Sequence, residues 1–212
     1  MLCLGIDPDM HDLAIASWDD LGPVTAHVVS VPKKITGTDA LLSMMHELSK
    51  PWPMLGRVMG EGCTHYYLDE FPDWCAVEGQ ETRQVRGKYH ARPLDLIHLG
   101  NVAGMCVMRV ALRYLNGCGL YWPKPSEWKG SVEKHAMQAR LYEEIGWGYE
   151  VVWKNQRAPI GRSRKGEYAV PQNPPAEFDN ISLMEWKHVG DALLLARWCW
   201  EQAAGRAWQK VG

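Results

Sequence analysis

The chain has 212 residues, of which 46% are hydrophobic and 23% are charged, and its net charge is −2 at pH 7. These values describe an ordinary globular protein, and we expect one domain spanning residues 1–212. No stretch reaches the apolar length of a membrane span and no secretory signal is recognisable, so we expect no association with a membrane. The six cysteines are scattered without a CxxC pair, which favours free buried thiols over a zinc site built from Cys63, His65 and Cys75. Free thiols in turn lead us to expect a cytoplasmic location.

The N-terminal half predicts strands first and helices afterwards. Alternating apolar residues indicate three strands, at 2–7, 12–18 and 25–32. An amphipathic helix is predicted over residues 38–50, with Thr38 as its N-cap. After a segment rich in glycine and proline, residues 74–79 predict a short strand that ends at Glu78, and residues 93–116 predict a long helix.

The C-terminal half alternates a strand with further helices. Residues 119–125 are predicted to end a strand, and a helix is expected to begin at Ser126 or at Ser131. An irregular segment, residues 148–181, precedes a last helix predicted over 182–208. Strands followed by strands that alternate with helices indicate an α/β fold with a mixed central sheet flanked by helices.

Two carboxylates lie at the ends of predicted buried strands. Asp7 ends the first strand just before Pro8, which cannot donate to a sheet, and Glu78 ends the strand at 74–79. If both strands belong to one sheet, the two carboxylates lie side by side, where burial is costly unless positive charge meets them. The alternative for Asp7 is a turn aspartate that caps its own backbone.

The last predicted helix adds an imidazole and a third carboxylate. His188 and Asp191 are three residues apart and therefore lie on nearly the same face of the helix. The apolar residues 192–198 should pack this helix on the sheet, which brings the imidazole and all the carboxylates to one point. Carboxylates so placed would repel one another, and Mg²⁺ or Mn²⁺ would remove the repulsion.

Two basic runs contrast with the acidic remainder of the chain. Residues 83–92 and 153–165 contain several cations and no acidic residue. Such segregation favours a surface that attracts polyphosphate, although a solvated loop is the alternative for each run. The candidate DNA-binding residues in these runs are Arg83, Arg86, Lys88, Arg92, Arg157, Arg162 and Arg164.

The motifs around the acidic residues resemble those of the RuvC family of Holliday junction resolvases. GIDP near the N-terminus, VEG after a later strand and KHVGDALLLA in the last helix follow the order of the family's motifs, and the similarity covers most of residues 1–147 and 182–200. The segment KPSEWKGSVEKHAMQ also resembles the family's corresponding strand end and helix, with Lys129 and Lys134 at the basic positions. The family's metal-binding positions fall on Asp7, Glu78, His188 and Asp191.

The resemblance implies a ribonuclease H-like fold and an endodeoxyribonuclease that resolves four-way junctions by paired phosphodiester cleavage, in the DNA recombination and repair of a bacterial cell or a phage-infected host. It implies two Mg²⁺ or Mn²⁺ ions per active site, with Asp7 bridging both, Glu78 completing one coordination sphere, and Asp191 with His188 completing the other. Lys129 or Lys134 would contact the DNA phosphate, and a solvated lysine is the alternative for each.

The sequence departs from the family's pattern at two places. Asp9 stands where the family has glycine, and we expect it to be a turn residue. The aromatic pair that follows the family's glutamate is absent, and residues 148–181 look like a basic insertion. Its aromatic residues Trp153, Tyr168 and Phe178 would either stack on DNA bases or pack into the core.

Other functions and the oligomeric state follow from the same features. A broader branched or flap DNA nuclease of the same fold and a non-catalytic DNA-binding module are the alternatives to a junction resolvase. An actin-like or Hsp70-like ATPase shares the GIDP start but needs a longer chain with further glycine-rich phosphate loops. Paired cleavage favours a homodimer bound to branched DNA, with the helix at 93–116 as the interface because it is apolar on more than one face. Coverage of that face by residues 51–72 is the alternative.

Overall fold

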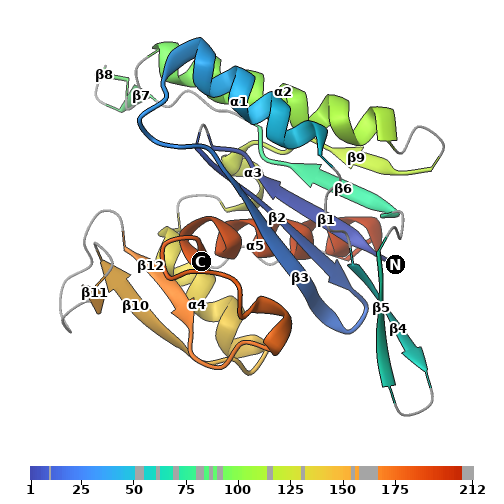
Figure 1. Cartoon of the computed structure of the whole chain (residues 1–212). Helices are drawn as coiled ribbons and strands as arrows, with labels where there is room; N and C mark the ends of the chain where they lie inside the picture. Colours follow the sequence, from blue (N-terminus) through green and yellow to red (C-terminus); the bar gives the residue numbers. More distant parts are fainter. Residues whose placement is uncertain are drawn as a thin grey trace.

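A five-stranded mixed sheet forms the centre of the protein (Figure 1). Its strands lie in the order β3-β2-β1-β6-β9, with β1, β2 and β3 antiparallel and β6 and β9 parallel to β1. They span Cys3–Asp7 (β1), Asp12–Asp19 (β2), Gly22–Ser30 (β3), Trp74–Val77 (β6) and Gly119–Tyr121 (β9). The computed structural model describes residues 1–9, 11–50, 55–60, 63–68, 72–79, 84–85, 88–89, 93–113, 117–129, 132–153, 156–157 and 167–206.

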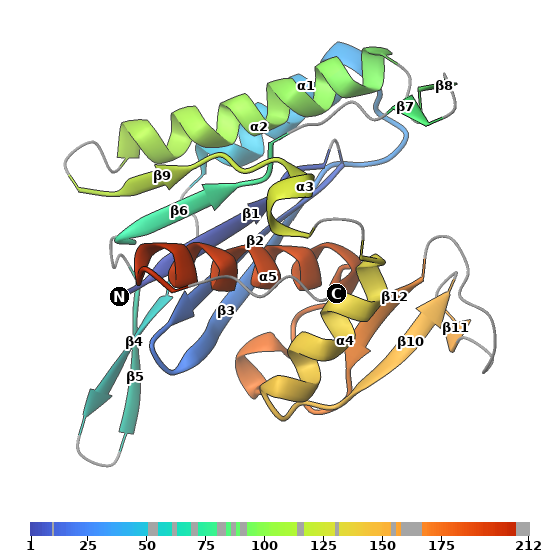
Figure 2. The ribbon, with the colours of Figure 1, turned by 180° about the vertical axis from the view of Figure 1, so that it is seen from behind.

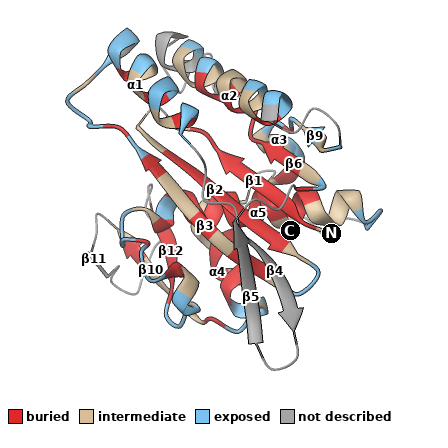
Figure 3. Ribbon diagram, turned by 45° about the vertical axis from the view of Figure 1, so that its right-hand side comes forward, coloured by how far each residue is buried: buried red, intermediate tan, exposed pale blue. Residues whose placement is uncertain are grey.

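Helices cover both faces of this sheet (Figures 1 and 2). Helices α1 (Gly37–Ser49) and α2 (Pro93–Arg113) pack on one face, and α5 (Trp186–Ala203) packs on the other. Strands β1, β2 and β6 and most of α5 are buried, whereas the outer sides of α1 and α2 are exposed (Figure 3). The predicted α/β fold, with a mixed central sheet flanked by helices, is confirmed.

A second, smaller sheet lies beside α5. Strands β10 (Tyr149–Trp153), β11 (Gln156–Arg157) and β12 (Tyr168–Pro171) form it in the order β11-β10-β12, and α4 (Lys134–Glu144) packs against both this sheet and α5. The short helix η1 (Ala176–Phe178) follows. Tyr168 and Phe178 are buried in the apolar core, so the hypothesis that these two side chains stack on DNA bases is wrong.

The remaining elements are short. Strands β4 (Leu55–Gly60) and β5 (Cys63–Leu68) form a hairpin, as do β7 (Gln84–Val85) and β8 (Lys88–Tyr89), and α3 (Pro125–Trp128) precedes α4. The β4–β5 hairpin contacts β2 and β3 and lies far from α2 in both views (Figures 1 and 2). In the described part of the chain, no helix has the length and apolarity needed to cross a membrane.

Several predicted helix ends are wrong by a few residues. Helix α4 begins at Lys134 rather than at Ser131, after a separate short α3 that begins at Pro125. The last helix begins at Trp186 rather than at residue 182, and residues 183–185 form a turn that leads into it. In this turn the Trp186 backbone amide donates to the Ser182 carbonyl at 3.3 Å, and the Ser182 backbone amide donates to the Glu185 carboxylate at 2.7 Å. At α1, Thr36 occupies the N-cap position predicted for Thr38.

Strand β1 and helix α5 approach each other most closely at Gly5. A Cβ atom on this residue would clash with the Ala192 carbonyl oxygen and the Ala196 backbone nitrogen, neither of which can yield as a flexible side chain could. The strand and the helix run antiparallel, because Gly5 lies against Ala196 whereas Asp7, later in the strand, contacts His188, earlier in the helix. Glycine at this position therefore sets how closely α5 packs on the central strand.

We expect Gly5→Ala to lower the free energy of unfolding by about 3 kcal/mol or more, because the added methyl group forces apart two closely packed backbones. Chemical denaturation monitored by circular dichroism measures the change. The matched control is Gly117→Ala, where a Cβ atom would meet nothing within 4 Å. Equal stability of the two variants would contradict the packing described for β1 and α5.

Candidate active site

The alternation of side chains along β1 decides where Asp7 points. Leu4 and Ile6 pack among the apolar residues under α1 and α2, so Gly5 and Asp7 are turned toward α5. Asp7 is the last residue of the strand, and it is only 7% exposed. The strand therefore delivers a buried carboxylate to the beginning of α5.

Glu78 lies beside Asp7 because β6 runs parallel to β1. Val77 is opposite Ile6, and the Glu78 backbone amide extends the ladder by donating to the Ile6 carbonyl at 3.0 Å. Cys75 and Val77 face α1 and α2. Because side chains alternate along a strand, Ala76 and Glu78 lie on the α5 side. Glu78 is also 7% exposed, so two neighbouring strands end in buried carboxylates on the same face of the sheet.

Helix α5 brings His188 and Asp191 to the same point. His188 Nδ1 lies 3.2 Å from Asp7 Oδ2, and since an ionised carboxylate can only accept, Nδ1 donates this hydrogen bond. Asp191 lies three residues further along the same helix face and is 4% exposed. The turn after β1 is held by Asp9 instead, whose Oδ1 accepts from the His11 backbone amide at 3.0 Å.

Two lysines neutralise the carboxylates of this cluster. Lys129, at the C-terminal end of α3, places its Nζ 2.8 Å from Glu78 Oε1 and 3.8 Å from Asp191 Oδ2. Lys134, the first residue of α4, places its Nζ 2.6 Å from Asp191 Oδ2. Both side chains are about three-quarters buried, at 25% and 28% exposure. The alternative of solvated surface lysines is therefore wrong, and their contact with DNA stays a prediction.

Burial and neighbouring charges shift the pKa values of Asp7 and Glu78 in opposite directions. Burial acts to raise the pKa of Asp7, but the hydrogen bond from His188 and the charges of Lys134 and Lys129 outweigh it, so this pKa lies well below its ordinary value. Burial, with repulsion by Asp7 and Asp191, raises the pKa of Glu78 to about 8, although Lys129 acts to lower it. The pKa of Lys129 is raised by the surrounding carboxylates despite its burial, which keeps this residue charged.

The raised pKa of Glu78 predicts that stability falls as pH rises from about 4.5, the ordinary value, to about 8. In this window the unfolded chain loses the proton that the folded protein keeps, so the unfolded state is favoured, by about 1.4 kcal/mol per pKa unit of difference. We expect Glu78→Gln to remove this slope in denaturation curves measured from pH 5 to pH 8. Identical slopes in the wild-type protein and the variant would contradict the assigned acidity.

The chemistry of the four side chains fits a divalent cation. Carboxylates with one imidazole are the donors that Mg²⁺ and Mn²⁺ accept in proteins. Among the residues that the structure describes, no three acidic, imidazole or thiol groups converge closely enough to enclose an ion. Lys129 lies between Glu78 and Asp191. A bound cation would therefore have to replace the lysines beside the carboxylate oxygens.

Most of the predicted DNA-binding residues fall outside the described part of the chain. Arg83, Arg86, Arg92, Arg162 and Arg164 lie there. Lys88 lies on β8 and Arg157 on β11, but the description does not extend to their side chains. The same holds for Cys63 and His65 of the alternative zinc site, whereas Cys75 is a buried free thiol. Both basic runs stay predictions.

Gln138 belongs to the cluster, although it is not among the residues predicted for the site. It is fully buried on α4, and its side-chain amide donates to Asp191 Oδ1 at 2.9 Å. The one signal in the sequence is its spacing from Lys134, because residues four apart share a helix face and both reach Asp191.

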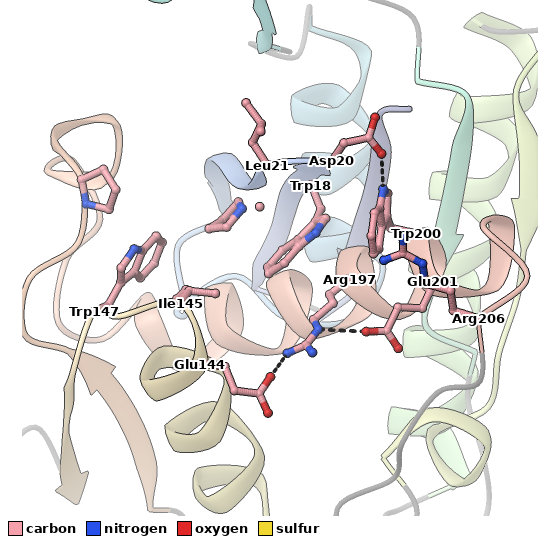
Figure 4. A pocket seen from close by; sticks show the side chains of 13 residues that line it. Trp18, Asp20, Leu21, Glu144, Ile145, Trp147, Arg197, Trp200, Glu201 and Arg206 are labelled. Atoms are coloured by element: carbon pink, nitrogen blue, oxygen red, sulfur yellow. Dashed lines mark hydrogen bonds and ion pairs between the residues drawn. The ribbon is translucent and has the colours of Figure 1, made fainter.

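A separate pocket of about 610 Å³ lies at the other end of α5 (Figure 4). Three tryptophans line it, and Trp18 is opposite Cys3 at the start of β1, whereas Asp7 ends that strand. Arg197 is paired there with Glu144 and Glu201. Arg197 and its two glutamates neutralise one another, so this pocket offers no group of like charges that would need a cation. The candidate active site is therefore the carboxylate cluster.

No model of a known protein family matches the sequence, and no curated protein matches it. Among solved structures, RuvC of Thermus thermophilus is similar over 98% of this chain and 98% of that chain, with 14% identity and a TM-score of 0.49. T. thermophilus RuvC in complex with a Holliday junction substrate is similar over 92% of this chain and 90% of that chain, with 14% identity and a TM-score of 0.47. These similarities concern the fold alone.

Proposed function

We propose that this chain is a metal-dependent, structure-selective endodeoxyribonuclease that resolves four-way DNA junctions by paired cleavage of phosphodiester bonds. The observation that supports the proposal is a buried cluster of charged groups from two strands and one helix, in which His188 hydrogen-bonds to Asp7 and Lys129 contacts both Glu78 and Asp191. The motifs that supply these residues occur in the order expected of the RuvC family, which supports junction cleavage in particular.

The proposed metal ligands are Asp7, Glu78, His188 and Asp191. Bound Mg²⁺ or Mn²⁺ supplies an activated water and stabilises the leaving oxygen of the phosphodiester. Asp7 lies between Glu78 on the neighbouring strand and His188 on α5, so it is the residue placed to serve both parts of the site. Its lowered pKa keeps it ionised at neutral pH, whereas Glu78 would lose its proton when a cation binds, because metal binding releases protons from its ligands.

Lys129 and Lys134 supply positive charge at the same point. In the free protein their ammonium groups pair with Glu78 and Asp191. Once cations neutralise these carboxylates, the two ammonium groups become available to the phosphate of the DNA strand that is cut. The two basic runs, residues 83–92 and 153–165, would hold the arms of the branched DNA through their phosphates.

A homodimer is the assembly that this function requires, because resolution needs two cuts related by the two-fold symmetry of the junction. The outer face of α2 is suited to the interface. Ile97, Met108 and Leu112 are 58%, 57% and 64% exposed and share one helix face with Gly104. The β4–β5 hairpin, from the segment that could have covered this face, contacts β2 and β3.

The two alternatives, a non-catalytic DNA-binding module and a broader branched-DNA nuclease, can be told apart from a junction resolvase by metal dependence and by substrate. A labelled four-way junction incubated with the protein should be cut in Mg²⁺ or Mn²⁺ and should stay intact in EDTA. Binding without cleavage in both ions would overturn the proposal in favour of a non-catalytic DNA-binding module. Equally efficient cutting of a flap substrate would favour the broader branched-DNA nuclease of the same fold.

We expect His188→Asp to keep junction cleavage and to shift its metal preference from Mn²⁺ toward Mg²⁺, because an oxygen ligand replaces a nitrogen ligand. Cleavage rates measured across a range of each ion test this. The control is His46→Asp, at an exposed position of α1 on the other face of the sheet, which leaves the four ligands unchanged. Total loss of cleavage in His188→Asp at every metal concentration would contradict the assignment of His188 as a ligand.

A further inference from the structure

Gln138 is an uncharged polar side chain that forms a hydrogen bond with the carboxylate cluster. Its Nε2 donates to Asp191 Oδ1 at 2.9 Å and to the Lys187 carbonyl at 3.2 Å. Its Oε1 accepts from the Ala169 backbone amide of β12 at 3.0 Å. Both amide protons and the amide oxygen are therefore used, and each partner belongs to an element other than α4.

These partners permit only one orientation of the amide. Turned by 180°, the amide oxygen of Gln138 would face the Asp191 carboxylate and the Lys187 carbonyl, which are acceptors, and its nitrogen would face a donor, the Ala169 N–H. The buried site offers no water-exposed alternative, because Gln138 is 0% exposed. The side chain is thus locked between α5 and β12.

The contact depends on the absence of a side chain at Gly190. A Cβ atom there would lie 2.7 Å from Gln138 Nε2 and 2.7 Å from the Tyr142 hydroxyl. Glycine therefore lets α4 approach α5 closely enough for the amide to reach Asp191, the next residue along the chain. The arrangement combines a small residue on one helix with a long amide on the other.

The two oxygens of Asp191 consequently have different partners. Oδ1 is held by Gln138, whereas Oδ2 faces Lys134 at 2.6 Å and Lys129 at 3.8 Å. Since Lys129 also contacts Glu78, Oδ2 is the oxygen turned toward the rest of the cluster. A hydrogen bond to one oxygen fixes the rotation of the whole carboxylate, and so fixes where the other oxygen lies.

We propose that Gln138 is a positioning residue that directs Asp191 Oδ2 toward the divalent cation and ties that orientation to the backbone of β12. This inference rests on the proposed function, because it assigns Asp191 as a metal ligand. It concerns a residue that touches neither cation nor DNA. It also links the sheet of β10, β11 and β12 to the metal site, because the Ala169 backbone amide holds the Gln138 side chain.

The test is the affinity for Mn²⁺ measured by calorimetry without DNA. We expect Gln138→Met, which keeps the length of the side chain but not its hydrogen bonds, to weaken Mn²⁺ binding by about tenfold or more. Gln138→Glu should weaken it as well, because it keeps an acceptor for Ala169 but removes the donor to Asp191. Leu141→Ala, a buried core position on the same helix, should lower the melting temperature and change the Mn²⁺ affinity by less than about twofold.

The outcomes separate this inference from the proposed function. Wild-type affinity for Mn²⁺ in Gln138→Met overturns the inference while the metal site stands. A wild-type protein that binds neither Mn²⁺ nor Mg²⁺ overturns the metal site and the inference with it. If the variants do not fold, the side-chain amide signal of Gln138 in the wild-type NMR spectrum should shift on addition of Mg²⁺, and an unchanged signal at saturation would overturn the inference.

Discussion

We expect Asp7→Asn to reduce junction cleavage by about 100-fold to 1000-fold while the affinity for the junction stays within about threefold of wild type. The large loss follows because a neutral amide cannot replace a buried carboxylate in holding cations at the reacting phosphate. The small change in affinity follows because the proposed DNA contacts lie on the basic runs, residues 83–92 and 153–165, which the substitution leaves intact. Single-turnover cleavage and gel-shift titration in EDTA measure the two quantities separately.

The matched control is Asp9→Asn, which makes the same chemical change two residues along the chain. Asp9 holds the turn after β1 by accepting from the His11 backbone amide, and an asparagine oxygen there can still accept this hydrogen bond. This control should cleave at close to the wild-type rate. Near wild-type cleavage by Asp7→Asn in Mg²⁺ would contradict the assignment of the active site, and so would an equal loss of cleavage in both variants.

The second large effect is expected at the outer face of α2. Gly104→Trp should convert the proposed homodimer to a monomer in sedimentation at micromolar concentration, because the indole occupies the space that a partner helix needs. A Cβ atom at Gly104 meets nothing within 4 Å, so the substitution should not disturb the fold of the single chain. The monomeric variant should cut one strand of a junction more readily than it makes two paired cuts.

Gly117→Trp is the control for added aromatic surface. Gly117 is exposed, with nothing within 4 Å of an added Cβ atom, and lies in the turn beyond α2. It should leave both the oligomeric state and paired cleavage unchanged. A wild-type protein that sediments as a monomer, alone and with junction DNA, would contradict the proposed dimer.

The fold was predictable because its signals are periodic and local. Alternation along residues 2–7 correctly places a buried strand, and the same alternation, once the sheet is known, explains why Asp7 faces α5 and Ile6 does not. The spacing of His188 and Asp191 likewise predicts one helix face. Patterns of this kind depend on neighbouring residues only, so one sequence is enough to identify them.

The details of the site depend on contacts between distant segments, which leave no such pattern. The resemblance marks Lys129 and Lys134 as basic positions, but only the folded structure shows that they are partners of Glu78 and Asp191. Gln138 could not be predicted for the same reason, because its contact with Asp191 joins two distant segments. The predicted start of the last helix was four residues early, because the hydrogen bonds between Ser182 and Glu185 are those of a helix cap although residues 183–185 form a turn.

Strand-resolved cleavage of a synthetic four-way junction tests the central claim most directly. Each of the four strands is labelled in turn, and the products in Mg²⁺, Mn²⁺ and EDTA are compared with those from a flap and from a linear duplex of the same sequence. The proposed function predicts two metal-dependent cuts at symmetric positions on opposite strands of the junction, with little cutting of the other substrates. No cleavage of the junction in either ion, or cleavage of the linear duplex at the same rate, would contradict it.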